Sequence, residues 1–276
     1  MSFTTHILPV LLFAILGILT GALLTIISKV FEVKVDERIE QISEALPQAN
    51  CGACGFAGCG DYANAIVTKG VPTNLCKPGG ADASTKISEI MGTIAEESTP
   101  ECAVVHCNGT CEASSKKFDF IGIDSCVSAK RFYGGTGACT YGCLGLGDCI
   151  KVCEYGAISI VDGIAKVDKS KCVACGKCTK ACPNGIISIK KISNHVDVLC
   201  SSHDNGKNTV TACKNGCIGC KMCEKKCPNG AITVENFCAK IDYSKCTSCG
   251  ECITACKRGA IKSCLQLQNV TETSKV

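Results

Sequence analysis

A block of cysteines recurs along the C-terminal half of this chain and limits what it can fold into. Three copies share the spacing C-x2-C-x2-C-x3-C: Cys172, Cys175, Cys178 and Cys182; Cys217, Cys220, Cys223 and Cys227; Cys246, Cys249, Cys252 and Cys256. A fourth segment, CLGLGDCIKVCEYGAISI, has the same layout but lacks one cysteine. Each block precedes a short β-prone run, and such units carry too few aliphatic residues for an ordinary core. A metal cofactor is therefore expected to organise them.

The spacing of the cysteines indicates which cofactor this is. Three thiolates at every third residue line one concave loop and can hold three corners of an iron–sulfur cubane. The fourth cysteine is carried away by the next helical turn and reaches a neighbouring cluster. Zinc prefers two C-x2-C pairs that close one tetrahedral site, so the triple runs argue against a zinc-bound structural protein. Pro183 and Pro228 directly follow the fourth cysteine and complete the bacterial ferredoxin pattern.

The N-terminus indicates the compartment. Residues 7–28 contain no charge and are long enough for one membrane-spanning helix. The first basic residues, Lys29, Lys34 and Arg38, all follow this stretch, which places the rest of the chain in the cytoplasm by the positive-inside rule. A cleaved export signal is the alternative. A single-pass anchor in the cell (inner) membrane with a cytoplasmic body is expected, where thiols stay reduced and free to bind metal.

Between this stretch and the blocks, apolar residues at helical spacing predict a small helical domain over residues 34–95. It surrounds four more cysteines, Cys51, Cys54, Cys59 and Cys76, three of them in the glycine-rich stretch CGACGFAGC. The glycines let the backbone approach a cluster closely and point N–H groups at its sulfur atoms. On spacing alone, a four-cysteine zinc site is the alternative here.

The paired blocks resemble bacterial two-cluster ferredoxins, twice over. Carrying the ferredoxin crossing onto this chain implies four [4Fe–4S] ligand sets: Cys217, Cys220, Cys223 and Cys256; Cys246, Cys249, Cys252 and Cys227; Cys172, Cys175, Cys178 and Cys153; and Cys143, Cys149 and Cys182 with a substitute ligand. The substitute is needed because Leu146 stands where the pattern has a cysteine. Cys139, four residues before Cys143, is the expected replacement, and loss of this cluster is the alternative.

The Cys51 stretch, with LCKPGG around Cys76, resembles the four-cysteine domain of Rnf complex B subunits. The order of anchor, helical domain and two ferredoxin modules resembles the extended form of that family. The resemblance implies a fifth cluster on Cys51, Cys54, Cys59 and Cys76. It also implies a subunit of an ion-translocating ferredoxin:NAD+ oxidoreductase, which passes electrons from soluble ferredoxin to membrane redox subunits and couples this flow to Na⁺ or H⁺ translocation.

Other features narrow the function. No P-loop and no complete G-x-G-x-x-G follows a predicted strand, so no NAD site and no catalytic residue is expected in this chain itself. The absence of Trp gives no support to a nucleic-acid-binding surface. Residues 171–276 carry a net positive charge, which suits an acidic soluble partner. A polyferredoxin subunit of another membrane oxidoreductase, such as a hydrogenase, is the alternative function.

The expected fold class is α+β, with seven segments: an anchor (1–33), a four-cysteine [4Fe–4S] domain (34–96), a connecting segment (97–138), a first ferredoxin module (139–192), a second connecting segment (193–212), a second module (213–264) and a tail (265–276). Cysteines outside the five sets remain: Cys102, Cys107, Cys111, Cys126, Cys200, Cys213, Cys238 and Cys264. Buried thiols that pack as small apolar groups are the expectation for them. A sixth cluster on Cys102, Cys107, Cys111 and Cys126 is the alternative.

Overall fold

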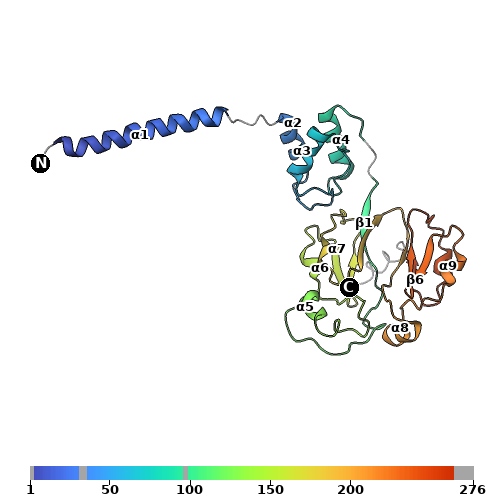
Figure 1. Ribbon diagram of the computed structural model, residues 1–276. Helices are drawn as coiled ribbons and strands as arrows, with labels where there is room; N and C mark the ends of the chain where they lie inside the picture. Colours follow the sequence, from blue (N-terminus) through green and yellow to red (C-terminus); the bar gives the residue numbers. More distant parts are fainter. Residues whose placement is uncertain (1–2, 31–35, 96–98, 264–276) are drawn as a thin grey trace, which may run out of the picture.

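The computed structural model describes residues 3–30, 36–95 and 99–263. Figure 1 shows a long N-terminal helix, then a small helical unit, then a larger unit of short strands and short helices. The expectations for Cys264, for the tail at 265–276 and for the last residues of the anchor lie outside the described residues.

The N-terminal helix, α1 (Phe3–Val30), stands apart from the other elements (Figure 1). Its described side chains are exposed and mostly apolar, among them Leu12, Phe13 and Ile18. Over the part of the chain that the structure describes, no helix has the combined length and apolar character needed to cross a membrane.

The helical unit has the elements that the apolar periodicity predicts. It consists of α2 (Glu37–Ala45), α3 (Cys59–Lys69) and α4 (Gly80–Met91). Ile42, Ile66 and Ile87, one from each helix, are fully buried against one another in a common core. Asp36 begins α2 by accepting a hydrogen bond from the backbone N–H of Arg38, which satisfies one of the free donors of the first turn. This core fixes the two loops that carry Cys51, Cys54 and Cys76.

The larger unit holds four antiparallel pairs of strands. The pairs are β1 (Glu101–Val105) with β4 (Ile187–Lys191), β2 (Ile158–Val161) with β3 (Ile164–Val167), β5 (Val196–Val198) with β8 (Ile261–Ser263), and β6 (Ile232–Glu235) with β7 (Cys238–Ile241). The short apolar runs GIAKVD and FCAKID, which stand between the paired cysteine blocks, form β3 and β7. Each module therefore has an inner hairpin and an outer pair.

The outer pairs show that the two modules are equivalent units. β1 lies in the predicted connecting segment before the first module, and it pairs with the last strand of that module, β4. β5 likewise pairs with the last strand of the second module, β8. The chain leaves β1 toward Cys107 and leaves β5 toward Cys200, so these two cysteines occupy corresponding places.

Short helices complete the modules: α5 (Cys126–Lys130), α6 (Asp148–Lys151), α7 (Lys177–Ala181), α8 (Gly206–Ala212), α9 (Met222–Lys226) and α10 (Glu251–Ala255). Four of them follow the cysteine loops, and each is preceded by a residue in the left-handed conformation: Gly147, Gly176, Lys221 and Gly250. Gly145 is also left-handed, and a Cβ there would lie 2.5 Å from the carbonyl oxygen of Gly163. The loop around Leu146 thus keeps the shape of the other three although it lacks their middle cysteine.

Each module has a small core in which cysteines are structural members. In the first module, Cys149 and Cys178 are buried together with Ile158, Ile164 and Ile187. In the second, Cys223 and Cys252 are buried with apolar residues of the corresponding strands. Few large side chains are present, which agrees with the expectation that a cofactor organises these units.

Candidate metal centres

The four N-terminal cysteines converge on one cavity. Cys51, Cys54, Cys59 and Cys76 line a cavity of about 320 Å³ between the loop before α3 and the loop before α4. Asn50 braces the first loop, because its side-chain oxygen accepts a hydrogen bond of 2.8 Å from the backbone N–H of Cys59. The structure thus brings together the four cysteines that the sequence analysis groups as one set.

Two of the ferredoxin-type sets also converge. Cys153, Cys172, Cys175 and Cys178 line a cavity of about 330 Å³, and Cys227, Cys246, Cys249 and Cys252 line one of about 300 Å³. In both cavities the cysteine that comes from the preceding block accepts a backbone hydrogen bond, from Ala157 to Cys153 Sγ (3.4 Å) and from Ala231 to Cys227 Sγ (3.3 Å). Backbone N–H groups directed at sulfur are a feature of iron–sulfur sites.

The set that contains Cys217 has one cysteine exposed at the surface. Burial raises the pKa of the Cys223 thiol to about 11, and the neighbouring charges of Cys217 and Cys256 raise it further, so these three lie close together. Cys220 and, in the adjacent set, Cys249 are exposed at the surface. Burial likewise raises the pKa of Cys178 and of Cys252 to about 11. Iron binding at these sites must therefore release protons from the thiols.

The set around Leu146 differs from the sequence prediction. Cys143, Cys149 and Cys182 line a cavity of about 390 Å³, but the fourth cysteine on it is Cys126, not Cys139. Burial raises the pKa of the Cys149 thiol to about 12, and the charges that add to this effect belong to Cys143, Cys126 and Cys182. Cys126 begins α5, in the segment before the first module, and lines this cavity together with the other three cysteines.

Asp148 holds the Cys126 segment in place. Its carboxylate accepts hydrogen bonds from the hydroxyl of Ser125 (2.8 Å) and the backbone N–H of Val127 (3.1 Å), the two neighbours of Cys126. Burial pushes the pKa of Asp148 upward, but these hydrogen bonds and the ammonium of Lys151 outweigh it and hold the pKa below its usual range. The lysine at the end of α5, Lys130, also donates to the carbonyl of Pro183, next to Cys182.

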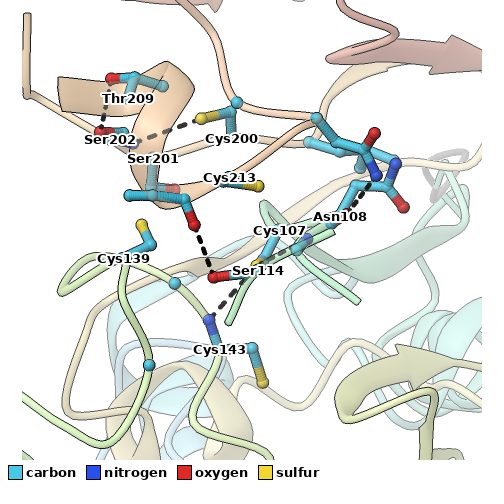
Figure 2. Close-up of a pocket in the computed structure, with 17 residues that line it drawn as sticks. Cys107, Asn108, Ser114, Cys139, Cys143, Cys200, Ser201, Ser202, Thr209 and Cys213 are labelled. Carbon is cyan, nitrogen blue, oxygen red and sulfur yellow. Dashed lines mark hydrogen bonds between the residues drawn. The ribbon is translucent and has the colours of Figure 1, made fainter. Parts of the chain in front are cut away.

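The remaining cysteines do not form the set that the sequence suggested as an alternative. Cys102 is fully buried in β1, Cys111 is exposed, and Cys126 lies with the first-module set. Cys107 lies instead with Cys139 on another cavity, at the junction of the two modules (Figure 2).

Sulfur-only donor sets around cavities fit a cluster better than a single ion. All of the cysteines that the structure describes are free thiols. Nowhere in the described chain do three His, Cys, Asp or Glu side chains come close enough to hold one metal ion. A mononuclear zinc site needs four ligands at about 2.3 Å from the metal, whereas a cubane spaces its thiolates around a larger body. The donor chemistry and the cavities therefore fit [4Fe–4S] clusters.

Comparison with known protein families supports the same cofactor. Residues 46–78 match a family described as a putative Fe-S cluster, residues 165–188 match a 4Fe-4S binding domain, and residues 216–260 match a 4Fe-4S dicluster domain. These matches cover the Cys51 stretch and parts of both ferredoxin modules. The chain therefore carries an Fe–S domain and two ferredoxin-type 4Fe–4S domains.

Three curated relatives extend over nearly the whole chain. One from Methanosarcina acetivorans, the B subunit of an ion-translocating oxidoreductase complex, is 44% identical over 90% of this chain and 94% of its own length. One from Clostridium ljungdahlii, the B subunit of a proton-translocating ferredoxin:NAD(+) oxidoreductase complex, is 40% identical over 98% and 97%. One from Acetobacterium woodii, the B subunit of a Na(+)-translocating complex of the same kind, is 42% identical over 92% and 77%. With this similarity over nearly its full length, and with its Fe–S domains in place, the chain belongs to the family of Rnf complex B subunits.

Proposed function

We propose that this chain is the membrane-anchored electron relay of its Rnf-type complex, which accepts electrons from reduced ferredoxin and passes them to membrane redox subunits. As a member of the family of Rnf complex B subunits, it is an electron-transfer component of an oxidoreductase complex. The observation that carries the detailed proposal is that four cavities, one in the helical unit and three in the ferredoxin modules, are each lined by the four cysteines of one set.

Five ligand sets follow from this proposal. They are Cys51, Cys54, Cys59 and Cys76; Cys153, Cys172, Cys175 and Cys178; Cys126, Cys143, Cys149 and Cys182; Cys217, Cys220, Cys223 and Cys256; and Cys227, Cys246, Cys249 and Cys252. Each holds one [4Fe–4S] cluster, which supplies reversible one-electron transfer when bound. The chain's own residues set the ligation, the burial and the hydrogen bonds that tune the potential.

The contact between the helical unit and the first module supports the proposed route. After burial and backbone effects, the charge of the Cys51 thiolate contributes to raising the pKa of Cys175. Burial raises the pKa of Tyr155, and the charges of Cys175 and Cys51 raise it further. Tyr155 lies beside Cys175 on the wall of the Cys175 cavity. The Cys51 set is therefore next to the Cys175 set, and the helical unit is the part that follows α1 in the chain. Electrons leave the first module through the Cys51 set toward the membrane.

Anchoring is part of the proposal. The exposed apolar side chains of α1 have no partner surface among the described residues, which suits a hydrocarbon environment. Lys29, Lys34 and Arg38 follow the apolar stretch and favour a single-pass arrangement with the Fe–S units in the cytoplasm.

The second module is the proposed docking site for reduced ferredoxin. Lys221, Lys225 and Lys226 are exposed beside the exposed Cys220. Lys245 is exposed a few residues before the exposed Cys249. A positive surface next to two accessible clusters steers an acidic electron donor toward them and shortens the distance for transfer. The complex then couples the flow from ferredoxin to NAD⁺ with translocation of Na⁺ or H⁺.

Replacement of Cys51 and Cys54 by alanine tests the route. In the complete complex, reduced ferredoxin should still reduce the clusters of the ferredoxin modules, but ferredoxin-dependent NAD⁺ reduction should stop. Cys111→Ala, which changes an exposed thiol outside all five sets, serves as the control and should leave turnover unchanged. Unimpaired turnover of the double variant would refute the proposed route.

The alternative, a polyferredoxin for another membrane oxidoreductase such as a hydrogenase, shares the two modules but does not require the Cys51 unit directly after α1. Purification of the complex distinguishes the two, because the proposal requires NAD⁺ reduction by the complex that contains this chain. Hydrogen-linked activity without NAD⁺ reduction would favour the alternative.

A further inference from the structure

Four cysteines that belong to none of the five sets line one cavity at the junction of the two ferredoxin modules. They are Cys107, Cys139, Cys200 and Cys213, and the cavity has a volume of about 530 Å³. It is larger than the three cavities whose predicted ligand sets the structure brings together, which measure about 300 to 330 Å³. In Figure 2 the four sulfur atoms surround one shared space, whereas the sulfur of Cys143 points away from it.

The two modules contribute equivalent halves of this site. Cys107 follows β1 and Cys200 follows β5, the corresponding outer strands. Cys139 stands four residues before Cys143, and Cys213 stands four residues before Cys217, the corresponding first cysteines of the two modules. Each half thus supplies one cysteine after a strand and one before a cysteine loop.

The hydrogen bonds repeat in the two halves as well. Cys107 Sγ accepts from the backbone N–H of Cys143 (3.3 Å) and of Gly109 (3.4 Å). Cys200 Sγ accepts from the backbone N–H of Cys217 (3.2 Å) and of Ser202 (3.5 Å). Paired N–H donors stabilise negative charge on sulfur and are typical of iron–sulfur ligands.

The backbone of two glycines also comes close to the sulfur atoms of this cavity. A Cβ at Gly109 would lie 3.6 Å from the sulfur atoms of both Cys107 and Cys213. A Cβ at Gly142 would lie 3.6 Å from Cys107 Sγ and 3.7 Å from Cys139 Sγ. Three of the four sulfur atoms are therefore close to two glycines that leave the space between them free of side chains.

The junction around the cavity is tightly bonded. Ser114 donates to the carbonyl of Ala212 (2.9 Å), and the amide of Asn215 donates to the carbonyl of Asn108 (2.9 Å). These bonds join the segment after β1 to the second module on both sides of the cavity. The cavity therefore lies within a bonded junction and is not a gap between loosely packed units.

We propose that Cys107, Cys139, Cys200 and Cys213 ligate a sixth [4Fe–4S] cluster, shared by the two ferredoxin modules. The donor set is four thiols, two from each module, and ligation releases their protons. The site lies directly between the set that contains Cys217 and the set that contains Cys143, because the backbones of these two residues donate to its sulfur atoms. It connects clusters that otherwise belong to separate modules.

The role of this site rests on the proposed relay function. One electron, supplied by reduced ferredoxin, enters from the Cys217 set, and one electron leaves toward the Cys143 set, so the site returns to its starting oxidation state. Without it, the electrons that enter the second module lack a cluster at the module junction. With this cluster, the five other clusters form one continuous path for electron transfer.

Iron and sulfide analysis of the full chain, purified anaerobically in detergent, tests the site. At four iron atoms per cubane, about 24 Fe and about 24 sulfides per chain are expected, and about 20 of each would overturn the sixth cluster. The double variant Cys139→Ala/Cys213→Ala, with one change in each half, should lose about four Fe and four sulfides. Cys107→Ala/Cys200→Ala should show the same loss, and Cys102→Ala, a fully buried thiol outside every set, should show none.

Reduction by ferredoxin separates this inference from the proposed function. In the double variant, reduced ferredoxin should reduce only about two clusters per chain, those of the second module, whereas dithionite should reduce all that remain. Reduction of all remaining clusters by ferredoxin would overturn the bridging role. A wild-type chain with about 24 Fe that ferredoxin does not reduce would instead refute the relay function and leave the sixth cluster standing.

Discussion

The ammonium of Lys190 lies 2.5 Å from a carboxylate oxygen of Asp197, and both side chains are almost fully buried. Lys190 belongs to β4, the last strand of the first module, and Asp197 belongs to β5, the first strand of the second. The hydroxyl of Tyr243 also donates to Asp197 (2.8 Å), and Lys190 donates to the carbonyl of Asn194 (2.6 Å). The pair therefore fixes the connection between the modules.

Asp197→Asn should destabilise this connection strongly. Removing one partner leaves the buried ammonium of Lys190 without its counter-charge, which costs about 3 to 5 kcal/mol. The midpoint of thermal unfolding, measured anaerobically on the loaded protein, should fall by several degrees. Lys240→Met is the matched control, because it breaks an exposed pair with Glu235 and should cost about 0 to 1 kcal/mol. Equal shifts for the two variants would contradict the structural role of the buried pair.

Much of the fold follows from the cysteine spacing, because each block fixes its own loop, short helix and strand. The partner strands β3 and β7 could be found from short apolar runs, and the helical unit from its periodicity. The assignments that needed coordinates concern cysteines far from the blocks. Cys126, which lines the cavity of Cys143, Cys149 and Cys182, comes from a segment whose length and path the sequence does not determine.

Cys139, which the sequence suggests as the substitute ligand, lines the junction cavity and not the cavity of Cys143, Cys149 and Cys182. Its position before Cys143 suggested a substitute for the ligand missing at Leu146. Cys213 has the same spacing before Cys217, although that block keeps its middle cysteine, Cys220. The shared spacing agrees with the role proposed for both cysteines at the module junction, and this signal was present in the sequence. Its partner lies across the module junction, which no local pattern reveals.

Asp148→Ala should weaken the cluster of the Cys126 set while all four thiols remain. The carboxylate orients both neighbours of Cys126, and loss of such a supporting partner typically lowers metal affinity about 10- to 100-fold. Iron release to a chelator should therefore include a fast phase of about four Fe per chain. Asp119→Ala, an exposed carboxylate in the same connecting segment, should release iron as the wild type does. Identical kinetics for Asp148→Ala and Asp119→Ala would refute the positioning role.

Tyr62→Phe should loosen the Cys76 loop. The Tyr62 side chain is fully buried, and its hydroxyl donates to the carbonyl of Pro72 (2.8 Å) and accepts from the backbone N–H of Leu75 (3.1 Å). Loss of the hydroxyl leaves these two groups without a partner, at about 1 to 3 kcal/mol each if they stay buried. Thermal unfolding and iron loss from the Cys51 set should both begin at lower temperature. Tyr133→Phe changes an exposed ring and should leave both unchanged.

Cys238 should tune the potential where the two modules meet. Its buried thiol lies within hydrogen-bond reach of the side chains of Cys200 and Cys217, and its single S–H, which can be donated to only one of them at a time, lowers the pKa of Cys200 to about 7 and that of Cys217 to about 6. Ile164 holds the corresponding place in the first hairpin, so Cys238→Ile gives the second module the residue that the first module has there. Hydrogen bonds to ligand sulfur favour the reduced, more negative cluster, and their loss makes the reduction potential more negative. An EPR-monitored redox titration should therefore show one or two clusters shifted to lower potential with the iron content unchanged. Unshifted potentials at full iron content would show that the thiol only fills space between Cys200 and Cys217.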